Sequence, residues 1–159
     1  MKLYIKQKVF SFADKFVVKN EDGTDAYFAA GKFFTLGKKL NIYEGTDSAD
    51  PVARIEQRLL SFTTRFGINV RGNHVMDMVR KVTVFSNDYR LEGLPWQLDG
   101  DFLAHEYRLM DGRNTIMEIS RKWFTWGDSY ELNIDDNQDP LLCLSIALAV
   151  DCCLCVRNR

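Results

Sequence analysis

The closing segment of the chain, DPLLCLSIALAVDCCLCVRNR from Asp139 onward, limits the possible folds more than any other part of the sequence. Asp139 followed by Pro140 is a good helix start, because aspartate is a preferred N-cap and proline suits the first helical position. Residues 141–156 are apolar on every side of a helical wheel, apart from Ser145 and Asp151. A helix of this kind either spans a membrane or lies at the centre of a protein.

The length of this apolar helix separates the two alternatives. Residues 141–156, at about 1.5 Å per residue, give a helix about 24 Å long, whereas a bilayer core about 30 Å thick requires about 20 apolar residues. Asp151 would add a further cost inside a bilayer. Strands of about 6–8 residues rise about 20–26 Å, which matches the helix. We therefore expect residues 139–156 to form a central helix inside a β barrel, and not a transmembrane anchor.

The sequence before this segment has the pattern of β-strands. Apolar residues alternate with polar ones in short runs rich in aromatic and β-branched residues, and turn signals separate the runs about every 8–12 residues. Such runs contain Leu3 and Ile5, then Leu40 and Ile42, then Phe66, Ile68 and Val70, then Leu103, His105, Tyr107 and Leu109, and finally Tyr130, Leu132 and Ile134. We predict one mainly β domain over residues 1–159, a closed barrel of about twelve strands that encloses the C-terminal helix.

An internal repeat adds detail to this prediction. Residues 53–70 align with residues 117–134 at a constant offset and without a gap, so that Ile55 falls on Ile119. Upstream, the stretch LNIYEG resembles YRLMDG. The length of the match favours a true repeat over the general likeness of any two β-hairpins. We therefore expect two similar halves of about six strands each.

Length, charge and the N-terminal sequence narrow the functional classes. A chain of 159 residues fits one domain with a sizeable core. Its net charge of −1 argues against a general nucleic-acid-binding protein, which usually carries a marked basic excess. The first residues, MKLYIKQKVF, lack the apolar stretch of a signal peptide. We expect a cytoplasmic protein with reduced thiols and no nucleic-acid partner.

Common catalytic and metal-binding motifs are absent from the sequence, which has no G-x-S-x-G, P-loop or G-x-G-x-x-G. His74 and His105 are not in a metal-ligand spacing, and we expect His105 to lie in the core or at the barrel mouth. The cysteines form no C-x-x-C motif and are expected to be packing residues; they are Cys143, Cys152, Cys153 and Cys155. Asp151 should pair with an arginine or lysine of the barrel mouth or face water. We predict a non-enzymatic protein without a metal or cofactor.

Four stretches of the sequence resemble the LURP-one-related family, which shares its fold with Tubby C-terminal domains and phospholipid scramblases. They are MKLYIKQKVFSFADKFVVKNEDG at the N-terminus, YFAAGKFFTLGKKLNIYE at 27–44, ARIEQRLLSF from Ala53, and YRLMDGRNTIMEISRKWFTWGDSYELNID at 107–135. The resemblance covers nearly the whole chain, and residues 116–135 are its most specific part. The length resembles that of short bacterial members. The resemblance implies a twelve-stranded barrel around a central helix and no known catalysis.

The resemblance also implies a class of ligand. Tubby proteins bind phosphoinositides through basic residues, and scramblases act at membranes, which indicates anionic lipid head groups or another phosphate ligand. The Tubby lipid-binding residues have no residue-by-residue match in this sequence. The candidate ligand-binding residues are therefore three basic pairs at expected strand ends: Lys38, Lys39, Arg80, Lys81, Arg121 and Lys122. The alternative is that these residues are solvated cations that protect strand edges.

Three functional hypotheses follow. We expect a binding or scaffold domain, peripheral to the membrane, that recognises anionic lipid head groups or another phosphate ligand at the barrel surface. The alternative is an adaptor that binds a protein partner and no small ligand. An enzyme of an unrecognised type would require a polar pocket around His105 or Asp151 with shifted pKa values. Because the helix would fill the barrel, any ligand should bind on the outer surface or at the rim.

Overall fold

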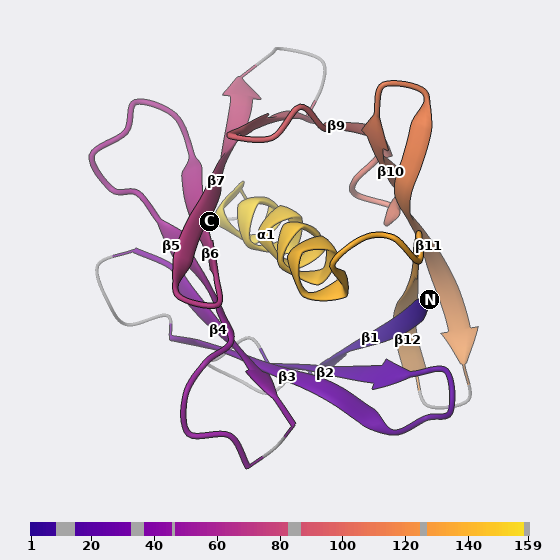
Figure 1. The fold of residues 1–159 in the computed structure, drawn as a ribbon. Coiled ribbons are helices and arrows are strands. Elements are labelled where there is room, and N and C mark those ends of the chain that lie inside the picture. The colour runs from indigo at the N-terminus through magenta and orange to yellow at the C-terminus, as the bar shows by residue number, and fades with distance from the viewer. Residues whose placement is uncertain (9–14, 33–36, 46, 83–86, 125–126, 158–159) are drawn as a thin grey trace.

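The computed structural model of this chain describes residues 1–8, 15–32, 37–45, 47–82, 87–124 and 127–157. Its strands are β1 (Lys2–Lys8), β2 (Lys15–Asn20), β3 (Asp25–Lys32), β4 (Lys39–Glu44), β5 (Ala53–Gln57), β6 (Arg65–Val70), β7 (Asn73–Val82), β8 (Asn87–Glu92), β9 (Gln97–Asp101), β10 (Glu106–Asp111), β11 (Asn114–Phe124) and β12 (Gly127–Ile134). One helix, α1 (Pro140–Arg157), follows them. Figure 1 shows the strands arranged around this helix.

The strands form a closed antiparallel barrel in which neighbours along the chain are also neighbours in the sheet. The barrel closes where β1 pairs with β12, with Leu3 opposite Leu132 and Ile5 opposite Tyr130. Because side chains alternate between the two faces of a strand, the apolar residue of every second position points inward, and these four side chains are buried. The predicted twelve-stranded closed barrel with a C-terminal helix is confirmed.

The helix begins as the sequence predicts. The backbone N–H of Leu141 donates to the Asp139 carboxylate (3.0 Å), so Asp139 caps the helix. Every side chain from Cys143 to Leu154 is buried, and the Ser145 hydroxyl donates to the backbone carbonyl of Leu141 (2.7 Å). The polar serine therefore costs little inside the barrel, because its donor has an acceptor within the helix. The apolar helix is the centre of the core.

Three of the cysteines have the packing role that the sequence predicts. Cys143, Cys152 and Cys153 are buried and carry free thiols. Burial raises the pKa of the Cys143 thiol to about 12, so this side chain stays protonated and unreactive at neutral pH. The side chain of Cys155 lies outside the described residues.

The predicted strand that includes Leu103 and His105 is wrong at its beginning. Strand β10 begins at Glu106, and residues 102–105 form a turn in which the His105 N–H donates to the carbonyl of Phe102 (3.3 Å). His105 has a left-handed backbone conformation (φ 56°), which breaks the alternation of faces. Phe102 is consequently buried, whereas Leu103 is exposed.

The internal repeat has a structural counterpart in two hairpins. In the β5–β6 hairpin Ile55 pairs with Ile68, and in the β11–β12 hairpin Ile119 pairs with Leu132. These pairs are equivalent under the alignment of residues 53–70 with residues 117–134. The repeated sequence therefore specifies the same pairing register twice.

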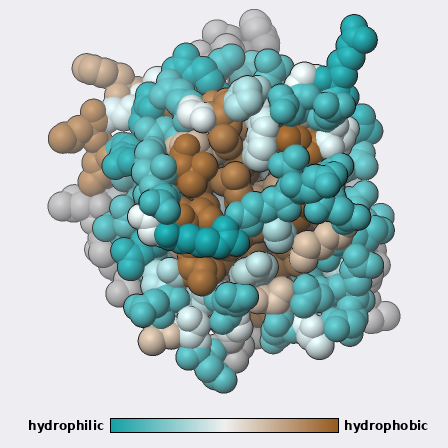
Figure 2. Space-filling model, viewed as in Figure 1, coloured by the Kyte–Doolittle hydropathy of each residue, from teal (hydrophilic) through white to brown (hydrophobic). Residues whose placement is uncertain are grey.

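The barrel interior is apolar and its surface is mainly polar. Figure 2 shows apolar side chains in the middle of the molecule, surrounded by hydrophilic ones. Among the described residues, no helix has both the length and the apolar character required to cross a membrane.

Candidate binding surface

Strand direction divides the connections between strands into two groups. The strands are antiparallel and follow one another around the barrel in chain order. One end of the barrel therefore holds every second connection, namely β1–β2, β3–β4, β5–β6, β7–β8, β9–β10 and β11–β12. Helix α1 begins at the opposite end, where Asp139 pairs with Arg71 of the β6–β7 connection. Its last turns reach His105 of the β9–β10 connection. We call the first end the helix-exit end; its described residues include 37–39, 58–65, 80–82, 102–106 and 121–124.

All three predicted basic pairs lie at the helix-exit end. Lys38 and Lys39 are at the start of β4, Arg80 and Lys81 are near the end of β7, and Arg121 and Lys122 are near the end of β11. In each pair one residue is exposed and the other is partly buried. The strand order separates the pairs around the barrel, so the structure places them on one rim and not in one pocket.

Some of this positive charge is balanced by neighbouring carboxylates. The Lys39 ammonium lies 3.5 Å from the carboxylate of Glu56, and the Lys122 ammonium lies 4.0 Å from that of Glu131. Both lysine side chains are about half exposed, so these ion pairs are weak and leave the ammonium groups accessible. The rim can therefore still attract an anionic surface.

The β5–β6 loop adds exposed apolar side chains to the same end. Leu60 and Phe62 have relative exposures of 104% and 110%, and Leu59 is also exposed. Leu103 of the β9–β10 turn is a further exposed apolar residue at this end. Figure 2 shows apolar atoms that project from the left edge of the molecule, where the β5–β6 loop lies in Figure 1. Side chains of this size are rarely left fully exposed together without an interaction to make.

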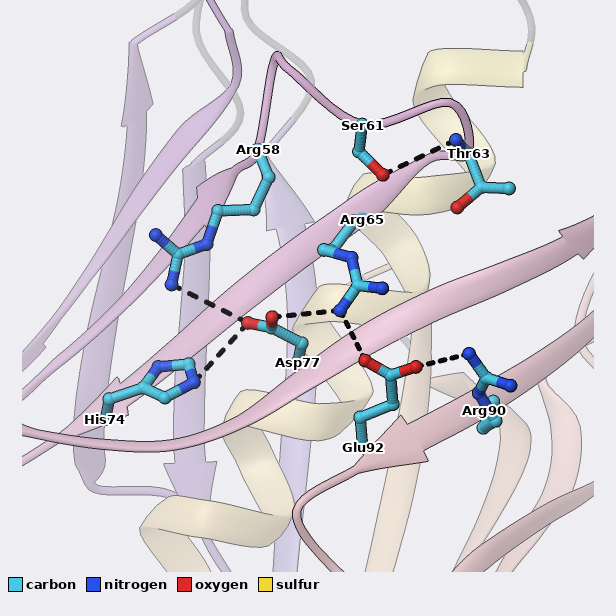
Figure 3. Close-up of polar contacts among 8 residues, drawn as sticks. All are labelled: Arg58, Ser61, Thr63, Arg65, His74, Asp77, Arg90 and Glu92. Atoms are coloured by element: carbon cyan, nitrogen blue, oxygen red, sulfur yellow. Dashed lines mark hydrogen bonds and ion pairs between the residues drawn. The ribbon is translucent and has the colours of Figure 1, made fainter.

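A network of ion pairs lies beneath this loop (Figure 3). Arg65 pairs with Asp77 (3.1 Å) and with Glu92, and Arg58 pairs with the same Asp77 carboxylate (3.7 Å). Arg90 also pairs with Glu92. Hydrogen bonds to Glu92 and Asp77 raise the pKa of Arg65, and the bond from Arg65 lowers the pKa of Glu92. The network fixes the two arginines that flank the loop.

A buried polar cluster lies just inside the helix-exit end. Asp151 of α1 accepts a hydrogen bond from the Tyr130 hydroxyl, and its other oxygen lies 3.0 Å from His105 Nε2. The His105 ring stacks on Tyr130, with 4.6 Å between ring centroids. The expectation that Asp151 pairs with an arginine or lysine or faces water is therefore wrong: Asp151 is buried, and the turn at residues 102–105 places a histidine beside it.

Electrostatics in this cluster favour a charged pair. Burial alone would lower the pKa of His105, but the hydrogen bond and negative charge of Asp151 outweigh it and raise the pKa. Burial, and then the Asp151 charge, raise the pKa of the Tyr130 hydroxyl well above its usual value. Tyr130 thus remains a neutral donor, and the Asp151 carboxylate favours the protonated form of His105. The cluster ties the helix to β12 and to the β9–β10 turn.

Sequence reasoning missed the three exposed apolar residues of the β5–β6 loop, Leu59, Leu60 and Phe62. The letters LLSF in Leu59–Phe62 look like strand or core sequence, although they lie between two alternating runs where a polar turn is usual. The location of these apolar residues where a turn is expected is the feature of the sequence that could have predicted their exposure. Within the described ranges, no group of three or more His, Cys, Asp or Glu side chains could hold a metal ion.

Comparisons with known proteins identify the family. The sequence model of the LURP-one-related family matches residues 1–151. The chain belongs to the LURP-one-related family. It is 38% identical over 151 residues to the uncharacterized protein YxjI of Bacillus subtilis (strain 168), which covers 95% of this chain and 92% of that protein. The X-ray structure of an Arabidopsis thaliana protein matches with a TM-score of 0.67 at 16% identity, over 99% of this chain and 92% of the other. This structural similarity supports the barrel fold of the LURP-one-related chain.

Proposed function

We propose that this LURP-one-related chain is a non-enzymatic domain that binds anionic, phosphate-bearing head groups at a membrane surface through the helix-exit end. One observation carries the proposal: the barrel topology gathers the three basic pairs at the same end as the exposed apolar loop. A basic surface near an anionic bilayer gains about 1 kcal/mol per Lys or Arg. Several residues acting together would therefore give measurable binding, although each one contributes little.

The opposite end of the barrel supports this orientation. Its connections carry exposed carboxylates at Glu21, Asp22, Asp47, Asp50, Asp135 and Asp136. The helix-exit end has exposed carboxylates of its own, at Asp88, Asp101 and Glu106, but they are accompanied by the exposed cations of the basic pairs. The opposite end is therefore the more negative of the two. An anionic surface would attract the helix-exit end and repel the other end.

Binding to lipid vesicles tests the proposal. We expect co-sedimentation with phosphatidylserine–phosphatidylcholine vesicles that weakens as salt is added, and little binding to pure phosphatidylcholine. Charge reversal at the exposed rim residues Lys39, Lys81 and Arg121 should weaken binding at least about tenfold for each substitution. The matched control is Arg113→Glu, because Arg113 is exposed at the acidic end. Binding that ignores the three rim reversals, or no binding at low salt, would refute the proposal.

Competition with inorganic phosphate shows whether the chain binds a lipid surface or a free phosphate ligand. Inorganic phosphate at millimolar concentration should compete only weakly with vesicles, because a single ion cannot engage basic pairs that lie apart around the rim. Strong competition, together with an increase in melting temperature on adding phosphate, would show instead that one local site binds a free anion.

A protein-binding function is the second candidate, and a different feature favours it. Among the described residues, β8 and β9 share one register pair, Arg90 with Gln97. A groove of 450 Å³ lies beside this seam and is lined by residues that include Tyr89, Trp96 and Leu98. An extended peptide could add to such a seam as a strand. Retention of a specific protein on the wild-type chain but not on Trp96→Ala, without any vesicle binding, would favour this candidate.

A further inference from the structure

We propose that the β5–β6 loop, residues 58–65, is a membrane anchor that inserts Leu60 and Phe62 into the interface between head groups and acyl chains. This inference rests on the proposed function and adds the apolar part of the interaction. Insertion of the loop differs from the interaction made by the basic pairs. Attraction to head groups depends on charge, whereas insertion depends on the apolar area that leaves water.

The first step is the exposure of the two side chains. Leu60 and Phe62 are fully exposed, whereas most other large apolar side chains in the described part of the chain are buried or partly buried. They are separated by Ser61, and all three belong to the connection between two well-paired strands. A leucine and a phenylalanine side chain gain substantially from leaving water. The loop is therefore suited to an apolar partner that can surround a protruding tip.

The second step is that the loop is held in place by its neighbours. The N–H of Arg58 donates to the carbonyl of Arg65 (2.9 Å), which closes the base of the loop. The carbonyl of Thr64 accepts from the N–H of Arg80 (2.9 Å), and the N–H of Thr63 donates to the Ser61 hydroxyl (3.4 Å). These bonds fix the base of the loop and so the position of its tip on the barrel, and preorganisation of this kind strengthens binding.

The third step is the charge at the base of the loop. Arg58 and Arg65 flank the apolar tip, and both point toward Asp77 in Figure 3. These guanidinium groups are already paired with carboxylates of β7 and β8. The charge that would meet phosphate head groups therefore comes from the exposed residues of the three basic pairs at the same end of the barrel. An apolar tip at the same end as several accessible cations is the arrangement by which peripheral proteins bind anionic bilayers.

A bilayer fits this surface better than a protein partner. Protein interfaces of useful affinity are usually broad, with anchor residues surrounded by other contacts. Leu60 and Phe62 instead project from one hairpin tip, and the basic pairs that share their end are distributed around the barrel. A fluid surface can contact both the tip and the distributed cations at the same time, which a single compact partner face would not do.

Paired variants of the full chain test the anchor. In the double variant that carries Leu60→Ser and Phe62→Ser, the affinity of the protein for phosphatidylserine–phosphatidylcholine vesicles should fall about a hundredfold, or roughly tenfold per residue. Because both side chains are fully exposed, the melting temperature should not change. The matched control, Leu60→Met with Phe62→Leu, keeps the apolar character and should retain binding. In a Phe62→Trp variant, brominated lipid should quench additional tryptophan fluorescence relative to the wild type.

The outcomes distinguish this inference from the proposed function. If the double serine variant binds as well as the wild type while rim charge reversals abolish binding, the anchor is refuted and head-group binding stands. Failure of the wild type to bind any anionic vesicle would overturn both. Lipid-free self-association that disappears in the double serine variant would show that a second copy covers the loop. Capture of a protein by the wild type in preference to vesicles would likewise overturn the anchor.

Discussion

Replacement of Leu148 at the middle of α1 is the sharpest test of the enclosed helix. Leu148 has no exposed surface in the folded protein. Its replacement by alanine removes buried methyl groups and leaves a cavity, which costs about 2–5 kcal/mol at such sites. A natural domain is stable by about 5–15 kcal/mol in total, so this single change should remove a large part of the stability.

Replacement of Leu148 by aspartate should be worse than the alanine substitution. An unpaired carboxylate inside the barrel adds several kcal/mol to the lost apolar contacts. The new carboxylate would also lie one helical turn from Asp151, whose existing partners are His105 and Tyr130, and two nearby negative charges repel each other. We therefore expect Leu148→Asp to yield no folded protein.

Thermal and denaturant unfolding, followed by circular dichroism, measure these effects. For a domain of this size, Leu148→Ala should lower the melting temperature by about 4–20 °C, from about 2–4 °C per kcal/mol. The matched control is the same substitution at the fully exposed Leu60, which should change stability by no more than about 0.5 kcal/mol. A folded Leu148→Asp variant with a transition like that of the wild type would show that the helix does not fill the barrel.

Three further predictions concern the polar contacts of the helix. The pKa of His105 is raised above 6.5 in the folded state. The stability that protonated His105 contributes is therefore complete below pH 6.5 and is lost as the pH rises through the folded-state pKa. His105→Gln should lower the melting temperature more at about pH 5.5 than at about pH 8.5. An equal loss at both pH values would contradict the charged pair with Asp151. Tyr130→Phe removes a buried donor and should cost about 1–3 kcal/mol in denaturant unfolding, independent of pH between about 6 and 8. Asp139→Ala should cost about 1–2 kcal/mol by loss of the N-cap, and more than Arg71→Ala, which removes only an exposed ion pair; equal effects would mean that the cap contributes nothing.

The sequence allowed the helix and the barrel to be predicted because each has a one-dimensional signal. The run from Leu141 to Val156 is too short for a bilayer and matches the height of a strand, and alternation at positions such as Leu40 and Ile42 marks an inward face. These signals depend only on local spacing. They predict which residues are buried, but not which distant residues meet.

The partners of Asp151 could not be predicted for that reason. His105 lies 46 residues away in the sequence, and its own left-handed conformation at the end of the turn is what no periodic pattern predicts. To predict that the three basic pairs lie at one end of the barrel, the direction of every strand must be known. These directions follow from the order in which the strands pair and not from any single motif. The exposure of Phe62 was unexpected because its sequence context resembles that of core residues.

The pairing of β1 with β12 has a consequence for how the chain folds. These strands are the first and the last of the barrel, with Leu3 opposite Leu132, so the barrel cannot close until β12 has been synthesised. The helix that fills the barrel comes later still. Contacts of such high sequence separation carry a large loop-closure entropy and are associated with slow folding. A nascent chain would therefore expose the apolar inner faces of its strands until α1 leaves the ribosome, which makes chaperone dependence and aggregation during synthesis measurable properties of this fold.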